Sequence, residues 1–197
     1  MAEAPARRSP LAGMAEALRR ASSPGLRLAE APFLAQFNLR GDPASRDFVE
    51  AASGALGLAL PTRVGAVARG AELSVLTLGP DEWLVVRPAE ANGEAIIRLR
   101  TALGRLHASL IDVSCNRTAL SLGGPRARDV LAKGVTLDLH PCAFGPGRCA
   151  QTLMARTPIL LEQTGEAPDY RLFVRASYAR HLAAWLIEAA REFAATG

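Results

Sequence analysis

The chain is poor in aromatic residues, lysine and cysteine, and these shortages exclude classes of function. Aromatic residues make up 5% of the 197 residues, and a single lysine stands among 23 basic residues. The arginines are scattered, with adjacent pairs only at Arg7-Arg8 and Arg19-Arg20. Nucleic-acid binding needs clustered cations and interleaved aromatic rings. The net charge of +4 therefore predicts no nucleic-acid partner. Arginine in place of lysine is attributed first to a GC-rich coding bias, with a secondary use in ion pairs at a protein interface.

Cysteine is equally scarce, and no long apolar run is present. Cys115, Cys142 and Cys149 form an odd set in a chain without a signal-peptide pattern. Reduced thiols in the cytoplasm are the simplest explanation. No stretch approaches the roughly 18 apolar residues of a membrane span, so we expect no membrane partner.

Composition divides the chain into an arm and a compact domain. Residues 1–25 are rich in Ala, Arg, Pro and Ser, with a weak helical pattern through Leu11, Met14 and Leu18. We expect this arm to be flexible or docked on a partner. Residues 26–193 have the length and apolar content of a single compact domain.

Periodicity and turn residues predict the elements of that domain. After an extended segment at 26–39, a helix should open at Gly41-Asp42-Pro43, with Asp42 as the N-cap. Asn92 and Ser177 are the expected caps of two further helices. The predicted strands are 63–68, 72–78, 83–87, 110–113, 118–122, 152–155, 159–163 and 170–174, and the predicted helices pass through 48–56, 96–106, 127–131 and 177–193.

The order strand, helix, three strands, helix occurs twice in this prediction. The segments 80–87 and 168–175 share Pro, Asp, Leu, Val and Arg at matching places, and each precedes a predicted helix. We therefore expect an α+β fold made of two pseudo-repeated halves, 26–107 and 108–193, each an antiparallel sheet covered by helices.

The search for reactive groups yields no self-contained site. Gly65–Gly70 has the spacing of a phosphate-binding loop but is followed by Ala and Glu, without the Lys and the Ser or Thr that such a loop requires. His140, Cys142 and Cys149 form one loose cluster, whereas structural zinc uses two close pairs of ligands. No Ser or Cys has a recognisable base and orienting group. We expect no catalytic, cofactor-binding or metal-binding residues in this chain.

Five segments, taken together, resemble one family. They are 78–84 with Gly-Pro-Asp-Glu-Trp-Leu, 112–120, 124–134 ending in Leu-Ala-Lys-Gly, 138–147 beginning Asp-Leu-His-Pro, and 177–186. In this order they resemble the gamma subunits of heterotetrameric sarcosine oxidases over residues 9–193. The resemblance implies duplicated ferredoxin-like halves related to the folate-binding domain of aminomethyltransferases.

The resemblance also implies a function. Such complexes oxidise sarcosine to glycine and hydrogen peroxide and pass the one-carbon unit to tetrahydrofolate. The chain would be a structural or assembly subunit bound to alpha, beta and delta subunits, chiefly alpha. FAD, FMN, NAD and tetrahydrofolate would lie on partner subunits. The contacts we expect at the interface are Leu11, Met14, Phe144, Pro146 and Arg148, since Phe and Arg are enriched at interfaces.

An alternative comes from the wider superfamily. One branch carries the signature Lys-Gly-Cys-Tyr-x-Gly-Gln, and the comparable place here is 140–147, where Cys142 is kept but the Lys and the Gln are not. The alternative function is a stand-alone folate-binding protein of aminomethyltransferase type.

Overall fold

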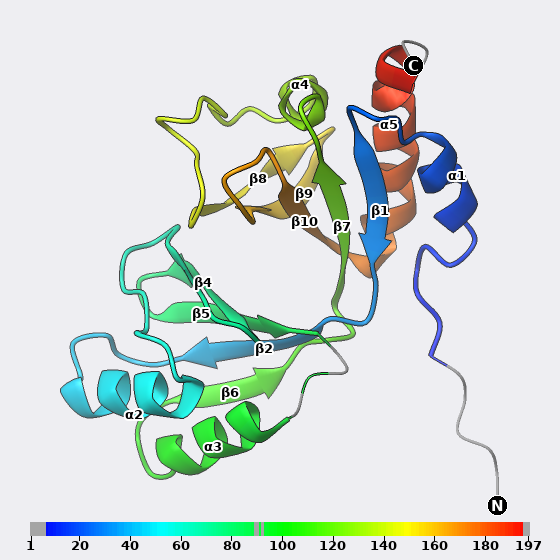
Figure 1. The fold of residues 1–197 in the computed structure, drawn as a ribbon. Coiled ribbons are helices and arrows are strands. Elements are labelled where there is room, and N and C mark those ends of the chain that lie inside the picture. The colour runs from blue at the N-terminus through cyan, green and yellow to red at the C-terminus, as the bar shows by residue number, and fades with distance from the viewer. Residues whose placement is uncertain (1–6, 89–90, 92, 195–197) are drawn as a thin grey trace, which may run out of the picture.

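The computed structural model describes residues 7–88, 91 and 93–194 (Figure 1). The helices are α1 (Ala15–Arg20), α2 (Arg46–Leu56), α3 (Glu94–Leu103), α4 (Ala127–Ala132) and α5 (Ala176–Ala194). The strands are β1 (Arg27–Ala31), β2 (Ala35–Arg40), β3 (Val67–Arg69), β4 (Ser74–Gly79), β5 (Glu82–Arg87), β6 (Ser109–Asp112), β7 (Arg117–Gly123), β8 (Cys149–Met154), β9 (Thr157–Gln163) and β10 (Tyr170–Arg175).

The strands form two antiparallel five-stranded sheets. The first sheet has the order β3-β4-β5-β2-β6, and the second has the order β1-β7-β10-β9-β8. The chain runs through the order β-β-α-β-β-β-α twice, from β1 to α3 and from β6 to α5. Matching elements occupy matching places in the two sheets, which agrees with the α+β repeat expected from the sequence.

The two halves exchange their first strands, which the sequence did not indicate. β1 lies beside β7 in the second sheet, and β6 lies beside β2 in the first sheet. The expected boundary between residues 107 and 108 therefore does not separate the sheets. Because each half supplies an edge strand to the other, the halves are linked by backbone hydrogen bonds as well as by side-chain packing.

The molecule has four layers (Figure 1). Helices α2 and α3 pack on the outer face of the first sheet, and α1, α4 and α5 pack on the outer face of the second. The inner faces meet in a third apolar cluster, to which Leu84 and Phe173 contribute. Central strands are thus buried on both faces, which explains continuous apolar runs such as 83–86 and 159–161.

The predicted extended segment 26–39 is broken in the middle. β1 ends at Ala31 and β2 begins at Ala35. Between them Phe33 has a φ of 59°, a left-handed conformation unusual for a bulky residue. This turn lets the two strands enter different sheets, so the break is what makes the strand exchange possible.

The helix starts differ from those expected. The N-cap of α2 is Ser45, whose hydroxyl accepts a hydrogen bond from the Phe48 amide at 3.3 Å, so the prediction of Asp42 was wrong. The Asp42 carboxylate instead accepts from the Ala44 amide at 2.8 Å, which makes it a turn residue. Ser177 lies inside α5, which begins at Ala176. Asn92 lies outside the described residues.

The N-terminal segment packs on its own chain. Leu11 and Leu18 are buried in the core of the second sheet, and Met14 packs against that core. α1 lies next to β1 and α5. The arm was expected to be flexible or held by a partner, but residues 7–25 form part of the domain because Leu11 and Leu18 complete its core.

Candidate functional site

A buried ionic cluster joins the two sheets. Glu162 on β9 is fully buried, and one of its carboxylate oxygens accepts a hydrogen bond from Arg69 on β3 of the first sheet. Arg171 on β10 lies 3.6 Å from the other oxygen, and the side chains of Arg69 and Arg171 are 38% and 23% exposed. The sequence reasoning missed this cluster, although a charged residue inside the apolar run 159–163 was a usable signal.

Burial governs the electrostatics of this cluster. Burial raises the pKa of Glu162 against the opposing effect of Arg171 and Arg69, and burial lowers the pKa of Arg171. Cys149 lies directly opposite Glu162 across β8 and β9, and burial together with Glu162 raises its pKa to about 12. The cluster is suited to holding the sheets together, and Cys149 stays a protonated thiol without nucleophilic character.

The histidines are dispersed over the surface. His107 follows α3, His140 lies in the loop after α4, and His181 lies on α5, all three exposed. His140 accepts a hydrogen bond on Nδ1 from the Cys142 amide at 3.3 Å, which fixes a turn. Within the described residues no group of three or more His, Cys, Asp or Glu side chains could hold a metal ion. Over residues 7–88 and 93–194 the contacts pair no Ser hydroxyl or Cys thiol with a histidine side chain as a base.

The residues expected at an interface fall into two groups. Leu11 and Phe144 are 0% and 3% exposed and belong to the core of the second sheet, so neither can contact a partner in this fold. Phe144 was expected to be exposed, and this was wrong because the 138–147 loop folds inward over the sheet. Met14 and Arg148 are half-buried, whereas Pro146 is exposed. The structure does not bring the five together as one surface.

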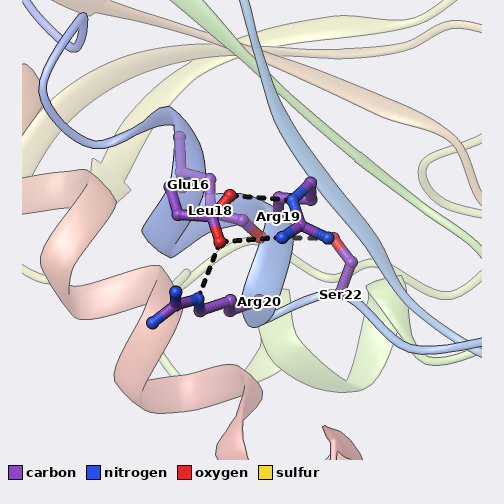
Figure 2. A network of polar contacts seen from close by, with 5 residues as sticks. All are labelled: Glu16, Leu18, Arg19, Arg20 and Ser22. Atoms are coloured by element: carbon purple, nitrogen blue, oxygen red, sulfur yellow. Dashed lines mark hydrogen bonds and ion pairs between the residues drawn. The ribbon is translucent and has the colours of Figure 1, made fainter.

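The outer side of α1 carries a small ionic network (Figure 2). Glu16 accepts hydrogen bonds from Arg19 at 2.7 and 2.8 Å and from Arg20 at 2.7 Å. These pairs are exposed and screened by solvent, so they contribute little to stability. Just beyond the helix end, the Ser22 hydroxyl lies 3.3 Å from the Leu18 carbonyl, one of two carbonyls within its reach. The network keeps this face of α1 solvated while Leu18 points into the core.

A surface groove of about 550 Å³ lies where β6 ends. Phe33, Phe37 and Arg87 are among its lining residues, and the Arg7 guanidinium lies 4.9 Å from the centre of the Phe33 ring. Nearby on β6, the side chain of Ile111 is 57% exposed. Apolar rings with arginines above them are typical of protein contact surfaces.

None of the described helices has the length and apolar character to cross a membrane.

Comparison with known proteins gives a consistent result. Residues 40–192 match the model of the sarcosine oxidase, gamma subunit family. The chain is 43% identical over 190 residues to the sarcosine oxidase subunit gamma of Corynebacterium sp. (strain P-1), covering 95% of this chain and 92% of that protein. It is 44% identical over 190 residues to the subunit of the same name from Arthrobacter sp., with the same coverage.

Solved structures agree with the family. A chain of the heterotetrameric sarcosine oxidase from Corynebacterium sp. U-96, in complex with pyrrole 2-carboxylate, superposes with a TM-score of 0.89 at 40% identity, covering 97% of this chain and 98% of that one. The glycine cleavage system aminomethyltransferase T from Bartonella henselae superposes with a TM-score of 0.60 at 18% identity, covering 87% of this chain and 48% of that one. The second likeness shows a shared fold.

Proposed function

This chain belongs to the sarcosine oxidase gamma subunit family, and we propose that it is a structural subunit of a heterotetrameric sarcosine oxidase. In this proposal the oxidation of sarcosine to glycine and hydrogen peroxide, and the transfer of the one-carbon unit to tetrahydrofolate, take place on neighbouring subunits. The chain itself stabilises the assembly, chiefly through contacts with the alpha subunit.

The observation that supports a non-catalytic role is the pairing of the buried Glu162 carboxylate with arginines. Among the described residues Glu162 is the only buried carboxylate. One of its oxygens accepts from Arg69 of the other sheet, and the second lies 3.6 Å from Arg171 on the neighbouring strand β10. Catalysis by a general acid or base needs a group free to exchange protons with a substrate. Glu162 is instead sealed between two sheets, which suits a scaffold.

The cofactors and the location belong to the same proposal. FAD, FMN, NAD and tetrahydrofolate are placed on partner subunits, and the complex is placed in the cytoplasm. The three free cysteines support a reducing compartment, since none is paired in this structure. The likeness to aminomethyltransferase T concerns the fold and does not favour the folate-binding alternative.

Co-expression tests the proposal. The chain should co-purify with tagged alpha, beta and delta subunits, and the purified complex should oxidise sarcosine. Complex made without this chain should be less stable to heat, because a subunit that binds only the assembled state stabilises it by mass action. The proposal fails if the three other subunits assemble with unchanged stability and the chain elutes separately.

A thermal-shift measurement separates the folate-binding alternative. Saturating tetrahydrofolate should leave the melting temperature of the isolated chain unchanged, because a ligand stabilises only the state that binds it. A rise in melting temperature would favour the stand-alone folate binder.

A further inference from the structure

The two sheets have four edges, and the chain covers three of them within the described residues. The β3 edge and the β8 edge cover each other, since Ala66 pairs with Arg148 in an antiparallel bridge. The Cys149 amide donates to the Gly65 carbonyl at 2.8 Å, and the Val67 amide donates to the Gly147 carbonyl at 2.9 Å. These bonds occupy backbone groups that an edge strand would otherwise expose.

The third edge, along β1, is covered by the N-terminal segment. The Leu28 amide donates to the Ser22 hydroxyl at 2.9 Å, and the single proton of that hydroxyl is shared between the carbonyls of Leu28 and Leu18, each 3.3 Å away. Ser9 also donates a hydrogen bond to the carboxylate of Glu30. Ser22 thus satisfies the outward amide of Leu28 and lies within hydrogen-bonding distance of its carbonyl, and α1 packs alongside.

The fourth edge is β6, the counterpart of β1 in the repeat. β6 pairs with β2 on one side, and no described strand or bridge lies on the other. Because the Val113 amide donates to the Gln36 carbonyl at 2.9 Å, the alternation of an antiparallel ladder directs the amides and carbonyls of Leu110 and Asp112 outward. The edge is short, and none of the described strands or bridges covers it as the N-terminal segment covers β1.

The surroundings of β6 indicate what would cover it. Ile111 exposes more than half of its side chain beside this edge. The groove that begins at Asp112 has phenylalanines in its lining and two arginines, Arg7 and Arg87. The arginines and the net charge of +4 disfavour a second copy of this chain and favour a segment with apolar and acidic side chains.

We propose that the open edge of β6 binds an extended segment of a partner subunit, which adds a sixth strand to the first sheet. The backbone of that segment pairs with Leu110 and Asp112, an apolar side chain contacts Ile111, and an acidic side chain enters the arginine-lined groove. Strand addition of this kind provides affinity through main-chain hydrogen bonds and specificity through alternate side chains. The proposal rests on the proposed function, because it needs a partner subunit.

Hydrogen exchange on the wild-type chain tests the backbone pairing. Free in the isolated chain, the amides of Leu110 and Asp112 should exchange rapidly, and in the purified complex they should exchange at least about 100-fold more slowly. Unchanged exchange at both amides in a complex that contains the chain overturns the proposal. A dimer of the isolated chain in sedimentation, with both amides already protected, overturns it as well, since a second copy would then occupy the edge.

A pair of matched variants tests the side-chain contact. Ile111→Lys should weaken binding to the partner subunits at least about tenfold, because it places a charge in a contact that excludes water. Leu153→Lys on β8 is the control, since its side chain is 50% exposed on an edge strand that the chain itself covers. The control should bind within about twofold of wild type.

The outcomes separate the two proposals. If wild-type chain does not co-purify with the other subunits, the proposed function fails. If wild type co-purifies and Ile111→Lys binds as tightly as Leu153→Lys, only the proposal that a partner strand docks on β6 fails. Should Ile111→Lys not fold, the exchange measurement on wild type decides.

Discussion

Leu11→Ala tests whether the N-terminal segment is part of the domain. Leu11 is fully buried in the core of the second sheet. The substitution removes three carbons, a loss of about 2.4 kcal/mol at about 0.8 kcal/mol each, and the remaining cavity adds to this. Because the segment is terminal, it can detach locally, so the loss in global stability is limited to the free energy that holds the segment in place. We expect about 2–3 kcal/mol.

Limited proteolysis measures this local opening directly. Trypsin cleaves after arginine, and Arg19 and Arg20 lie in α1, where an intact helix protects the backbone. A loss of about 2–3 kcal/mol raises the open population, and with it the cleavage rate at these two bonds, about 30- to 150-fold. The N-terminal fragment that ends at Arg19 or Arg20 identifies the event.

A matched substitution serves as the control. Leu153→Ala removes the same atoms from a half-exposed side chain on β8, and it should change stability by less than about 0.5 kcal/mol. If Leu11→Ala is cleaved at Arg19 and Arg20 no faster than Leu153→Ala, the segment does not depend on Leu11. The inference that it completes the core would then be refuted.

Three further predictions concern the interior. Since burial raises the pKa of Glu162 in the folded chain, its contribution to stability is full below the unfolded pKa of about 4.3 and is lost as pH rises through the folded pKa. Glu162→Gln should remove this fall in stability, which urea unfolding at a series of pH values upward from the unfolded pKa measures. With a pKa of about 12, Cys149 should react with thiol reagents only after unfolding, while the two exposed cysteines react at once; prompt reaction of three thiols would contradict this. Gly124→Ala should destabilise the fold by about 2 kcal/mol or more, because φ is 106° and the new Cβ would lie 2.6 Å from the Gly25 carbonyl oxygen. Gly54→Ala inside α2 should instead stabilise the fold by about 0.5–1 kcal/mol. Thermal melts of both variants check the pair.

Much of the fold could be predicted because the order of strands and helices depends on the spacing of apolar and turn-forming residues that are neighbours in the sequence. The matching segments 80–87 and 168–175 became β5 and β10, which occupy equivalent positions in the two sheets. Strand and helix order followed from apolar spacing and turn residues. The caps were less accurate: Asp42 and Ser45 are both good N-cap residues within three positions, and only the path of the chain selects Ser45.

The candidate interface could not be predicted in the same way. Phe144 was expected at an interface because Phe and Arg are enriched there, and Leu11 because the N-terminal arm has little apolar content of its own. Both are buried in the core of the second sheet with residues distant in sequence. Exposure of Ile111 on an edge strand that has no second neighbour among the described strands is likewise a matter of strand pairing, which no local pattern records.

The amino-acid sequence by itself determined the family, the α+β repeat and the order of the elements, because motifs and periodicity are properties of neighbouring residues. Tertiary structure alone decided the exchange of β1 and β6, the pairing of Arg69 with Glu162 across the sheets, and which sheet edge is left open. Each of these depends on contacts between residues far apart in the chain, since burial and strand pairing are fixed only when the two halves meet.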